Sequence, residues 1–164
     1  YGRGPEENYR DRRTSQFIGE YTSGIQDMYE PYVRPQENNH RTDIYWCALT
    51  DKTQRGLLLI ADRTFELNTS NYPLESMDSG DTIDNSAPRT EKTHHRHLTD
   101  PLPEKMVDLF IDYRMMGVGG DDSWGATAHE PYLIRPGKEN AIEYGFSLVP
   151  FDKKEDYKYL IRQY

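Results

Sequence analysis

The sequence predicts an all-β fold built from antiparallel strands. Its apolar segments are short, rich in Ile, Val, Tyr and Phe, and bounded by turn residues, as is typical of strands. Five segments have this character, at residues 42–49, 56–62, 64–70, 106–117 and 141–151. Only the carboxy-terminal tail has the spacing of apolar residues that indicates a helix.

The first predicted strands are the most apolar. Residues 42–49 (TDIYWCAL) would bury Trp46 and make Cys47 a buried strand thiol rather than a nucleophile. Residues 56–62 and 64–70 follow as separate strands. An earlier segment, residues 15–29, is a weaker candidate because two glycines interrupt it.

The later segments differ in kind. In 106–117, apolar residues at odd positions from 107 to 113 face one side and charged residues at 108, 112 and 114 the other, as in a half-buried strand. Residues 72–92 are rich in Ser, Asp, Pro and Gly, which predicts a long surface loop that is an insertion. In the tail, residues 152–164, Asp152 and Glu155 fit a helix cap, and apolar residues at 157, 160 and 161 share one face.

Composition limits the function. The chain has 164 residues, about one domain, and a formal charge of −8 without a basic stripe, which argues against a nucleic-acid partner. No apolar run is long enough to span a membrane and YGRGPEENYR is not a signal peptide, so we expect a soluble protein of cytoplasm or periplasm. The single cysteine excludes an internal disulfide and a cysteine zinc site.

Two polar clusters invite a chemical interpretation. In HHRH, residues 94–97, strand alternation puts only His95 and His97 on one face and no further ligand follows, so a structural role is favoured over a metal. Asp121 and Asp122 are neighbours on one loop, whereas a retaining glycosidase needs two carboxyl groups facing each other about 5 Å apart. Their simpler role is to accept backbone N–H bonds in a turn.

That loop, GVGGDDSWG at residues 117–125, lacks the lysine of a phosphate-binding loop and the aspartate order of a calcium loop. Its Trp124 stands among Gly, Asp and Ser, which is typical of an indole at a surface rather than in a core. A flat aromatic beside carboxylates suits a sugar. From the residues alone, contact with a sugar or peptide and a structural loop cap both stay open.

Four motifs, in order, carry a family resemblance: GPEENYRDR (4–12), DMYEPYVRPQEN (27–38), HRHL (95–98) and GVGGDDSWG (117–125). On these, the chain resembles the carboxy-terminal "small chain" part of the large β-galactosidases of glycoside hydrolase family two. The resemblance runs over residues 4–151, with departures at 72–92 and in the tail. The family often has Gly after QEN, where this chain has Asn39; Asn also tolerates a positive φ, so we expect the turn to be kept.

The resemblance implies a fold and a division of labour. The family's last domain is an antiparallel β-sandwich of the galactose-mutarotase-like type, of which residues 1–164 would be roughly the carboxy-terminal half. Catalysis belongs to a separate α/β barrel with two glutamates and with magnesium and sodium sites, so this chain is expected to hold no catalytic residue, metal or cofactor. The tryptophan of DDSW stacks on the sugar, which implies substrate binding by Trp124. The implied loop supports are Gly119, Gly120, Asp121, Asp122 and Ser123.

The implied partners are the rest of the β-galactosidase, including its barrel, and a galactoside such as lactose, in a homo-oligomeric parent. The chain alone is then expected to be inactive. Two alternatives remain: an independent carbohydrate-binding module of β-sandwich type and a pure interaction domain. The chain opens inside a family motif at Tyr1, which favours a fragment over a module.

Overall fold

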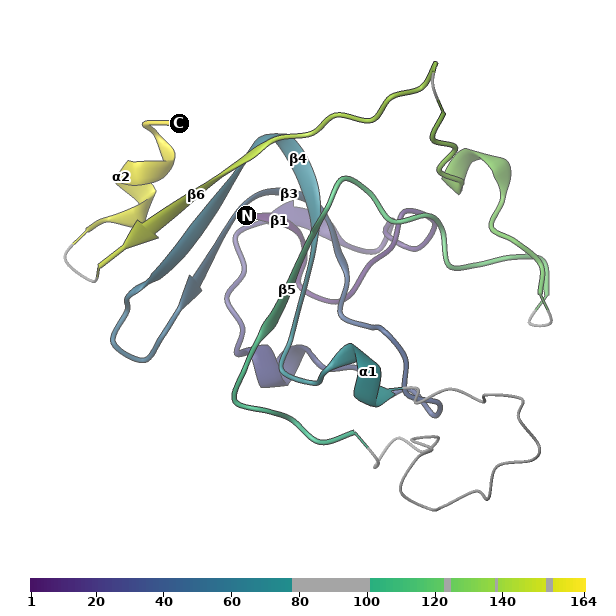
Figure 1. Cartoon of the computed structure of the whole chain (residues 1–164), viewed down its shortest axis with the longest axis horizontal. Coiled ribbons are helices and arrows are strands. Elements are labelled where there is room, and N and C mark those ends of the chain that lie inside the picture. Colours follow the sequence, from purple (N-terminus) through teal and green to yellow (C-terminus); the bar gives the residue numbers. More distant parts are fainter. Residues whose placement is uncertain (78–100, 123–124, 138, 153–154) are drawn as a thin grey trace. The chain divides into compact units, whose positions relative to one another are not determined.

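The computed structural model describes residues 1–77, 101–122, 125–137, 139–152 and 155–164 (Figure 1). The chain forms two compact units, which we describe separately. Unit 1 comprises Tyr1–Thr22, His40–Leu67 and Ile111–Tyr164, and unit 2 comprises Ser23–Asn39 and Asn68–Phe110.

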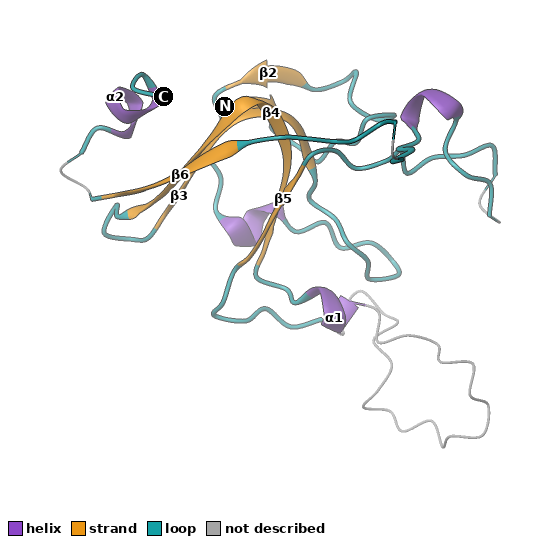
Figure 2. Ribbon diagram, turned by 45° about the horizontal axis from the view of Figure 1, so that its top comes forward, coloured by secondary structure: helices purple, strands orange, loops and turns teal. Residues whose placement is uncertain are grey.

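The described residues are mostly strand and loop, with few helical turns (Figure 2). The strands are β1 (Gly2–Gly4), β2 (Phe17–Gly19), β3 (Arg41–Thr50), β4 (Gly56–Ser70), β5 (Asp108–Asp112) and β6 (Phe146–Phe151). The helices are α1 (Leu74–Met77) and α2 (Tyr157–Ile161), with 3-10 turns η1 (Ile25–Met28) and η2 (Glu130–Tyr132). The strands form two sheets, and β1–β2, β3–β4 and β4–β6 pair antiparallel. The predicted all-β, antiparallel fold is confirmed.

Strand β4 is the centre of the larger sheet. It pairs with β3 through a hairpin and also with β6, and the strand order β3-β4-β5 makes β5 a further neighbour. Two strands were predicted at 56–62 and 64–70, but they are one continuous strand. The predicted break is nevertheless visible in the pairing, because Trp46 pairs with Ile60 and Ile44 with Phe65, so that residues 61–64 bulge away from β3.

The two later strands are shorter than predicted. Of residues 106–117, only Asp108–Asp112 form β5, and Met106 and Val107 are exposed. Of residues 141–151, only Phe146–Phe151 form β6, which pairs with the six residues from Gly56 to Ala61 of β4. Just before the strand, the Gly145 carbonyl still accepts the Asp62 N–H at 3.0 Å.

The tail covers one face of this sheet, as its apolar spacing predicted. Leu58 and Ile60 alternate along β4 and form a buried cluster with Phe151, against which Tyr157, Leu160 and Ile161 of the tail pack. The predicted cap at Asp152 belongs to a separate turn, in which Asp152 and Glu155 are joined by two hydrogen bonds of 2.7 and 2.8 Å. The helix α2 begins after Asp156, whose carboxylate accepts the Lys158 N–H at 2.9 Å, whereas Asp152 donates its own N–H to Glu155.

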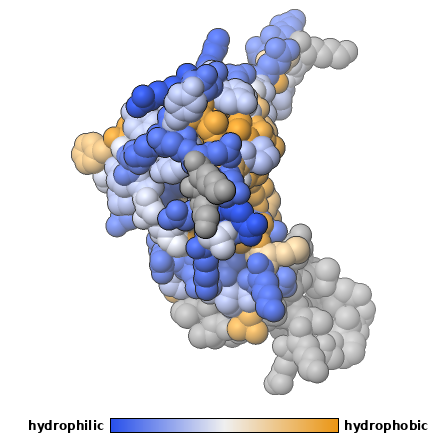
Figure 3. Space-filling model, turned by 90° about the vertical axis from the view of Figure 1, so that its left-hand side faces the viewer, coloured by the Kyte–Doolittle hydropathy of each residue, from blue (hydrophilic) through white to orange (hydrophobic). Residues whose placement is uncertain are grey.

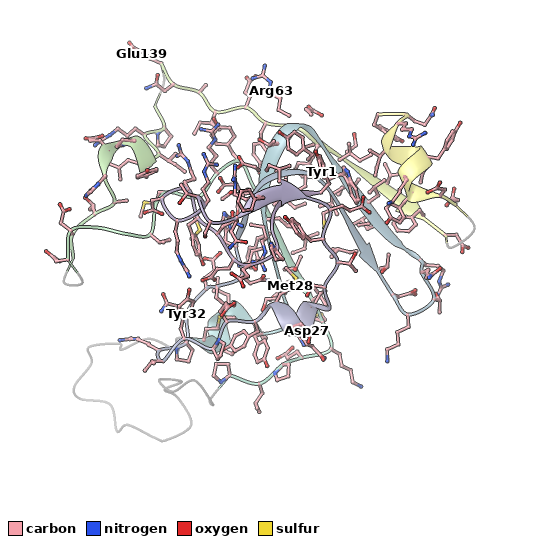
Figure 4. All side chains as sticks on the ribbon, turned by 180° about the vertical axis from the view of Figure 1, so that it is seen from behind. Tyr1, Asp27, Met28, Tyr32, Arg63 and Glu139 are labelled. Carbon is pink, nitrogen blue, oxygen red and sulfur yellow. The ribbon has the colours of Figure 1, made fainter. Side chains whose placement is uncertain are left out.

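Trp46 packs against the same cluster but is half-buried, not buried as predicted. Its ring is flanked by Tyr1 and Tyr157, at centroid distances of 6.3 and 5.8 Å. Tyr1 reaches it because the amino-terminal residue runs beside β3 and donates to the Trp46 carbonyl at 2.8 Å (Figure 4). Because these two rings cover the Trp46 indole only in part, the indole keeps some of its surface in water.

The face of the molecule seen in Figure 3 is predominantly hydrophilic, in keeping with a chain that is 29% charged. In Figure 3 the hydrophobic residues form smaller patches among hydrophilic ones. The exposed large apolar side chains of unit 1 include Phe17 of β2 and Leu148 of β6.

Unit 2 is held together largely by amide side chains. Asn38 accepts the Glu30 N–H at 3.0 Å, and Asn68 donates to the Asn38 carbonyl at 2.7 Å. Asn39 donates to the Thr69 carbonyl and has φ 68°, which confirms the turn expected where the family often has Gly. The turn η1 carries Asp27 and Met28 (Figure 4). These two residues begin the motif at residues 27–38, which ends at Asn38. Of the predicted insertion, residues 72–77 include α1 and residues 78–92 lie outside the described part.

Candidate functional site

The motif at residues 4–12 is organised around one buried amide. Asn8 is fully buried and donates to the backbone carbonyls of Arg3 and Glu6 at 3.1 and 3.0 Å. Its oxygen accepts both the N–H and the hydroxyl of Thr42, at 3.0 and 2.6 Å. Because the amide binds both the local carbonyls of Arg3 and Glu6 and the distant Thr42, it fixes the motif against the start of β3.

A second set of contacts continues from the same motif. The buried carboxylate of Glu7 accepts from Arg12 at 2.9 Å and from the Tyr9 hydroxyl at 3.2 Å. The Tyr9 ring stacks on His40, with centroids 5.4 Å apart and planes 10° apart. His40 is wholly buried, and its Nε2 lies 2.8 Å from a carboxylate oxygen of Glu66 in β4.

The Glu66 carboxylate also reaches toward residues 117–125, which we call the glycine loop. The same oxygen that meets His40 accepts the N–H of Met115 at 2.6 Å. Met115 stands two residues before the glycine loop begins. A buried carboxylate therefore holds the backbone from which the loop departs.

The strand-like ends of residues 9–12 form a tight turn. Tyr9 and Arg12 are bridged by two backbone hydrogen bonds, 3.2 and 2.8 Å long, so that Arg10 and Asp11 lie at the tip. Arg10 donates to the carbonyl of Pro131 at 3.4 Å. We call this hairpin the 9–12 turn.

Asp11, at that tip, binds the glycine loop directly. Its two carboxylate oxygens accept the N–H groups of Val118 and Gly119, at 3.2 and 2.8 Å. The neighbouring Gly117 is buried and donates to the Tyr132 carbonyl at 2.9 Å. Figure 1 shows the surrounding segment (green) running out from the sheet after β5 and returning by an extended stretch to β6. Glu139 lies on that stretch (Figure 4).

The two aspartates of the loop have separate partners. Asp121 lies 2.8 Å from the Nε2 of His129, in a pair that is exposed on both sides. Asp122 accepts the N–H of Ala126 at 3.4 Å. Each carboxylate thus contacts the return limb of its own loop. This is the arrangement of turn-forming aspartates.

The glycines of the loop meet close neighbours or unusual backbone angles. A Cβ on Gly119 would lie 3.2 Å from Asp11, and one on Gly120 would lie 2.7 Å from the Ala126 carbonyl. Gly125 has φ 133°, which L residues rarely adopt. Ser123 and Trp124 lie outside the described residues, so the place of the predicted sugar-binding indole rests on the sequence.

The described part of the chain offers no support for a metal site or a nucleophilic cysteine. Across the described residues, no group of three or more His, Cys, Asp or Glu side chains could hold a metal ion. His95 and His97 lie outside these residues. Cys47 lies in β3 and is half-buried, not fully buried as predicted. Desolvation by burial raises the pKa of its thiol, which opposes a nucleophilic role. No helix in the described ranges is long and apolar enough to cross a membrane.

The family described as beta galactosidase small chain matches residues 1–148. The chain belongs to this family. The small-chain match includes the 9–12 turn and the whole glycine loop, so both of the segments joined by Asp11 lie within the family's domain.

Relatives support the assignment. A protein named Beta-galactosidase from Priestia megaterium is 34% identical over 134 residues, which is 82% of this chain and 12% of that protein. One of the same name from Leuconostoc mesenteroides is 32% identical over 89% of this chain and 12% of that protein. Another, from Pseudoalteromonas haloplanktis, is 28% identical over 81% of the chain and 11% of that protein. The chain spans about an eighth of the relatives' length or less.

Sequence reasoning did not find two residues that hold the loop, Asp11 and Glu66. Asp11 stands inside a family motif, and this was the one signal available. For Glu66 the only signal in the sequence was weak: it is an acidic residue within an apolar strand. In the structure its side chain is buried, with 4% of the residue exposed.

Proposed function

We propose that this chain is the carboxy-terminal part of a retaining β-galactosidase, which hydrolyses terminal β-D-galactosides such as lactose. In this proposal the glycine loop carries Trp124 to a sugar-binding site formed with the catalytic barrel, and the chain itself supplies no catalytic carboxylate. The magnesium and sodium ions of the family belong to that barrel. The rest of the chain's surface contributes to packing and assembly of the enzyme.

The observation that carries the proposal is the attachment of the glycine loop to Asp11. An exposed loop rich in glycine loses much backbone entropy when it is ordered, so it keeps one shape only if other groups hold it. Asp11 supplies two bonds from a carboxylate, which are stronger than bonds between neutral groups. A loop held in this way suits the presentation of one rigid side chain to a ligand.

Asp121 and Asp122 fit a supporting role better than a catalytic one. A retaining glycosidase needs a carboxylic acid and a carboxylate that face each other across the sugar. These two aspartates are neighbours in sequence, and each contacts the return limb of the same loop, at His129 and Ala126. Hydrolysis is therefore assigned to another part of the enzyme.

The decisive test is Trp124→Ala in the full-length β-galactosidase. A stacking aromatic is worth about 0.5–1.5 kcal/mol beyond the area it buries, so we expect KM for lactose to rise about two- to tenfold. The thermal midpoint should hardly change. Trp46→Ala is the matched control, with a loss of about 2–3 kcal/mol of stability, less than for a fully buried aromatic, and an unaltered KM. An unchanged KM in Trp124→Ala would refute the substrate-binding role.

A second test uses the chain by itself. Purified chain should release no aglycone from a chromogenic β-galactoside, and calorimetry should give a galactose Kd of about a millimolar or weaker, because one stacking contact is far from the roughly 8 kcal/mol of a micromolar complex. A micromolar Kd would instead favour an independent carbohydrate-binding module. Activity that is lost with Asp121→Asn would overturn the division of labour.

A further inference from the structure

We propose that Asp11 is a positioning residue for the glycine loop: its carboxylate holds the limb of the loop that leads to Trp124 and thereby raises the affinity for substrate. This inference rests on the proposed function, since it requires Trp124 to contact sugar. It adds a residue that lies outside the loop and makes no contact with substrate in the proposal.

Both oxygens of the Asp11 carboxylate bind the backbone of the glycine loop. Oδ1 and Oδ2 of Asp11 accept from Val118 and Gly119, two consecutive N–H groups, at 3.2 and 2.8 Å. Both donors lie on an exposed part of the chain, where water would otherwise compete for them. Binding two successive peptide groups by one rigid carboxylate fixes both the position and the orientation of the backbone.

The 9–12 turn that carries Asp11 is itself held by several contacts. The 9–12 turn is closed by the two bonds between Tyr9 and Arg12, and both of these side chains also contact the buried Glu7. The Tyr9 ring is held further by stacking on the buried His40. A carboxylate at the tip of such a turn has a defined place.

The glycine loop packs closely against the 9–12 turn. A Cβ on Gly117 would lie 2.5 Å from the Asp11 carboxylate, so only glycine lets the backbone come this close. The other side chain at the tip, Arg10, donates to the Pro131 carbonyl on the return limb. Adjacent residues of one turn therefore bind both limbs of the segment that carries the loop.

The experiment is a double-mutant cycle in the full-length β-galactosidase, with Asp11→Asn, Trp124→Ala and the pair. Asn keeps one acceptor but turns an NH₂ donor toward a backbone N–H, so one bond is lost and a repulsion is added. We expect Asp11→Asn to raise KM about two- to fivefold, by no more than Trp124→Ala does, with little change in kcat. In the Trp124→Ala background the same change should have no further effect on KM.

The matched control is Asp51→Asn in the β3–β4 hairpin. Asp51 likewise accepts two backbone N–H groups in an exposed turn, from Thr53 and Arg55 at 2.7 and 3.0 Å. If bonding of this kind mattered only for stability, both variants would lower the melting temperature and neither would change KM. We expect a change in KM from Asp11→Asn alone.

The outcomes separate the two proposals. If Trp124→Ala leaves KM unchanged, the proposed function fails and this inference fails with it. If Trp124→Ala raises KM while Asp11→Asn does not, or if the two effects multiply in the double variant, only the role of Asp11 is refuted.

A milder variant covers the case in which Asp11→Asn does not fold. The Cβ of Gly119→Ala would stand 3.2 Å from the Asp11 carboxylate and would push it by a few tenths of an ångström. We expect a smaller rise in KM that is again absent without Trp124. Gly137→Ala is its control, because nothing lies within 4 Å of that Cβ. Equal KM values for the two glycine variants would count against the inference.

Discussion

Gly117→Ala is the sharpest test of how closely the glycine loop packs. Gly117 is buried, and its added Cβ would lie 2.5 Å from the Asp11 carboxylate and 2.8 Å from the Cβ of Tyr132. Both distances are shorter than contacts that real Cβ atoms make, so one or both neighbours must move. The movement would separate Asp11 from the N–H groups of Val118 and Gly119.

The size of the effect follows from two opposing contributions. Overpacking of a close contact typically costs about 1–3 kcal/mol. Replacing Gly by Ala also restricts the unfolded chain, which stabilises by about 0.4–1 kcal/mol where the backbone angles suit Ala. Gly137→Ala gains the second contribution without the first, because its Cβ would meet nothing within 4 Å. The difference between the two variants therefore isolates the contact.

Thermal unfolding of the two variants, followed by circular dichroism, measures this difference. For a domain of this size, 1 kcal/mol corresponds to a shift of about 2–4 °C, so Gly117→Ala should melt roughly 2–12 °C below Gly137→Ala. Restoring space with Gly117→Ala/Asp11→Ala should recover part of the loss. If the two single variants melt together, the loop does not pack against Asp11 as closely as the structure has it.

Three further predictions concern the rest of unit 1. Phe65→Ala removes an aromatic that is 1% exposed, and should cost about 3–5 kcal/mol in denaturant unfolding; a cost below 1 kcal/mol would contradict its place in the core. Hydrogen bonds to its carboxylate, with the largest effect from the Thr53 hydroxyl and the next largest from the Arg55 backbone N–H, lower the pKa of Asp51 to about 2. The ionised form therefore stabilises the hairpin fully above pH 3.8, and this stabilisation is lost as the pH falls through about 2; an NMR titration with a midpoint near 3.8 would exclude it. Burial raises the pKa of Cys47, so iodoacetamide should modify it more slowly than free cysteine at pH 8, and equal rates would show an accessible thiolate.

The strands could be predicted where local chemistry decides them. Leu57 to Ile60 form a short run of large apolar residues that follows Gly56, and this length and boundary favour a strand over a helix. The ends of strands depend instead on pairing. β6 begins at Phe146, whose neighbour in the sheet, Ala61, is where the bulge of β4 starts, and no pattern within residues 141–145 carries that information.

Of two residues with positive φ, Asn39 and Asp43, only Asn39 could be predicted from its local sequence. The positive φ of Asn39 followed from the side chain's own tolerance of that region. Asp43 also has a positive φ, of 55°, at a register shift between β3 and β4, and its carboxylate binds two arginines, Arg3 and Arg13. These contacts span up to 40 residues and could not be predicted from the sequence around position 43.

The glycine loop shows where sequence reasoning stops. Its composition predicted a shaped loop with turn-forming aspartates, and Asp121 and Asp122 do contact its return limb. The residue that holds its departing limb, Asp11, is 107 positions from Val118, and a lone aspartate beside three arginines has no local pattern that indicates such a partner. Since glycines leave a backbone free to move, however, an ordered glycine loop always requires contacts from elsewhere. The polar residues of the other family motifs were therefore the right place to look for them, and Asp11 at the tip of a turn meets that requirement.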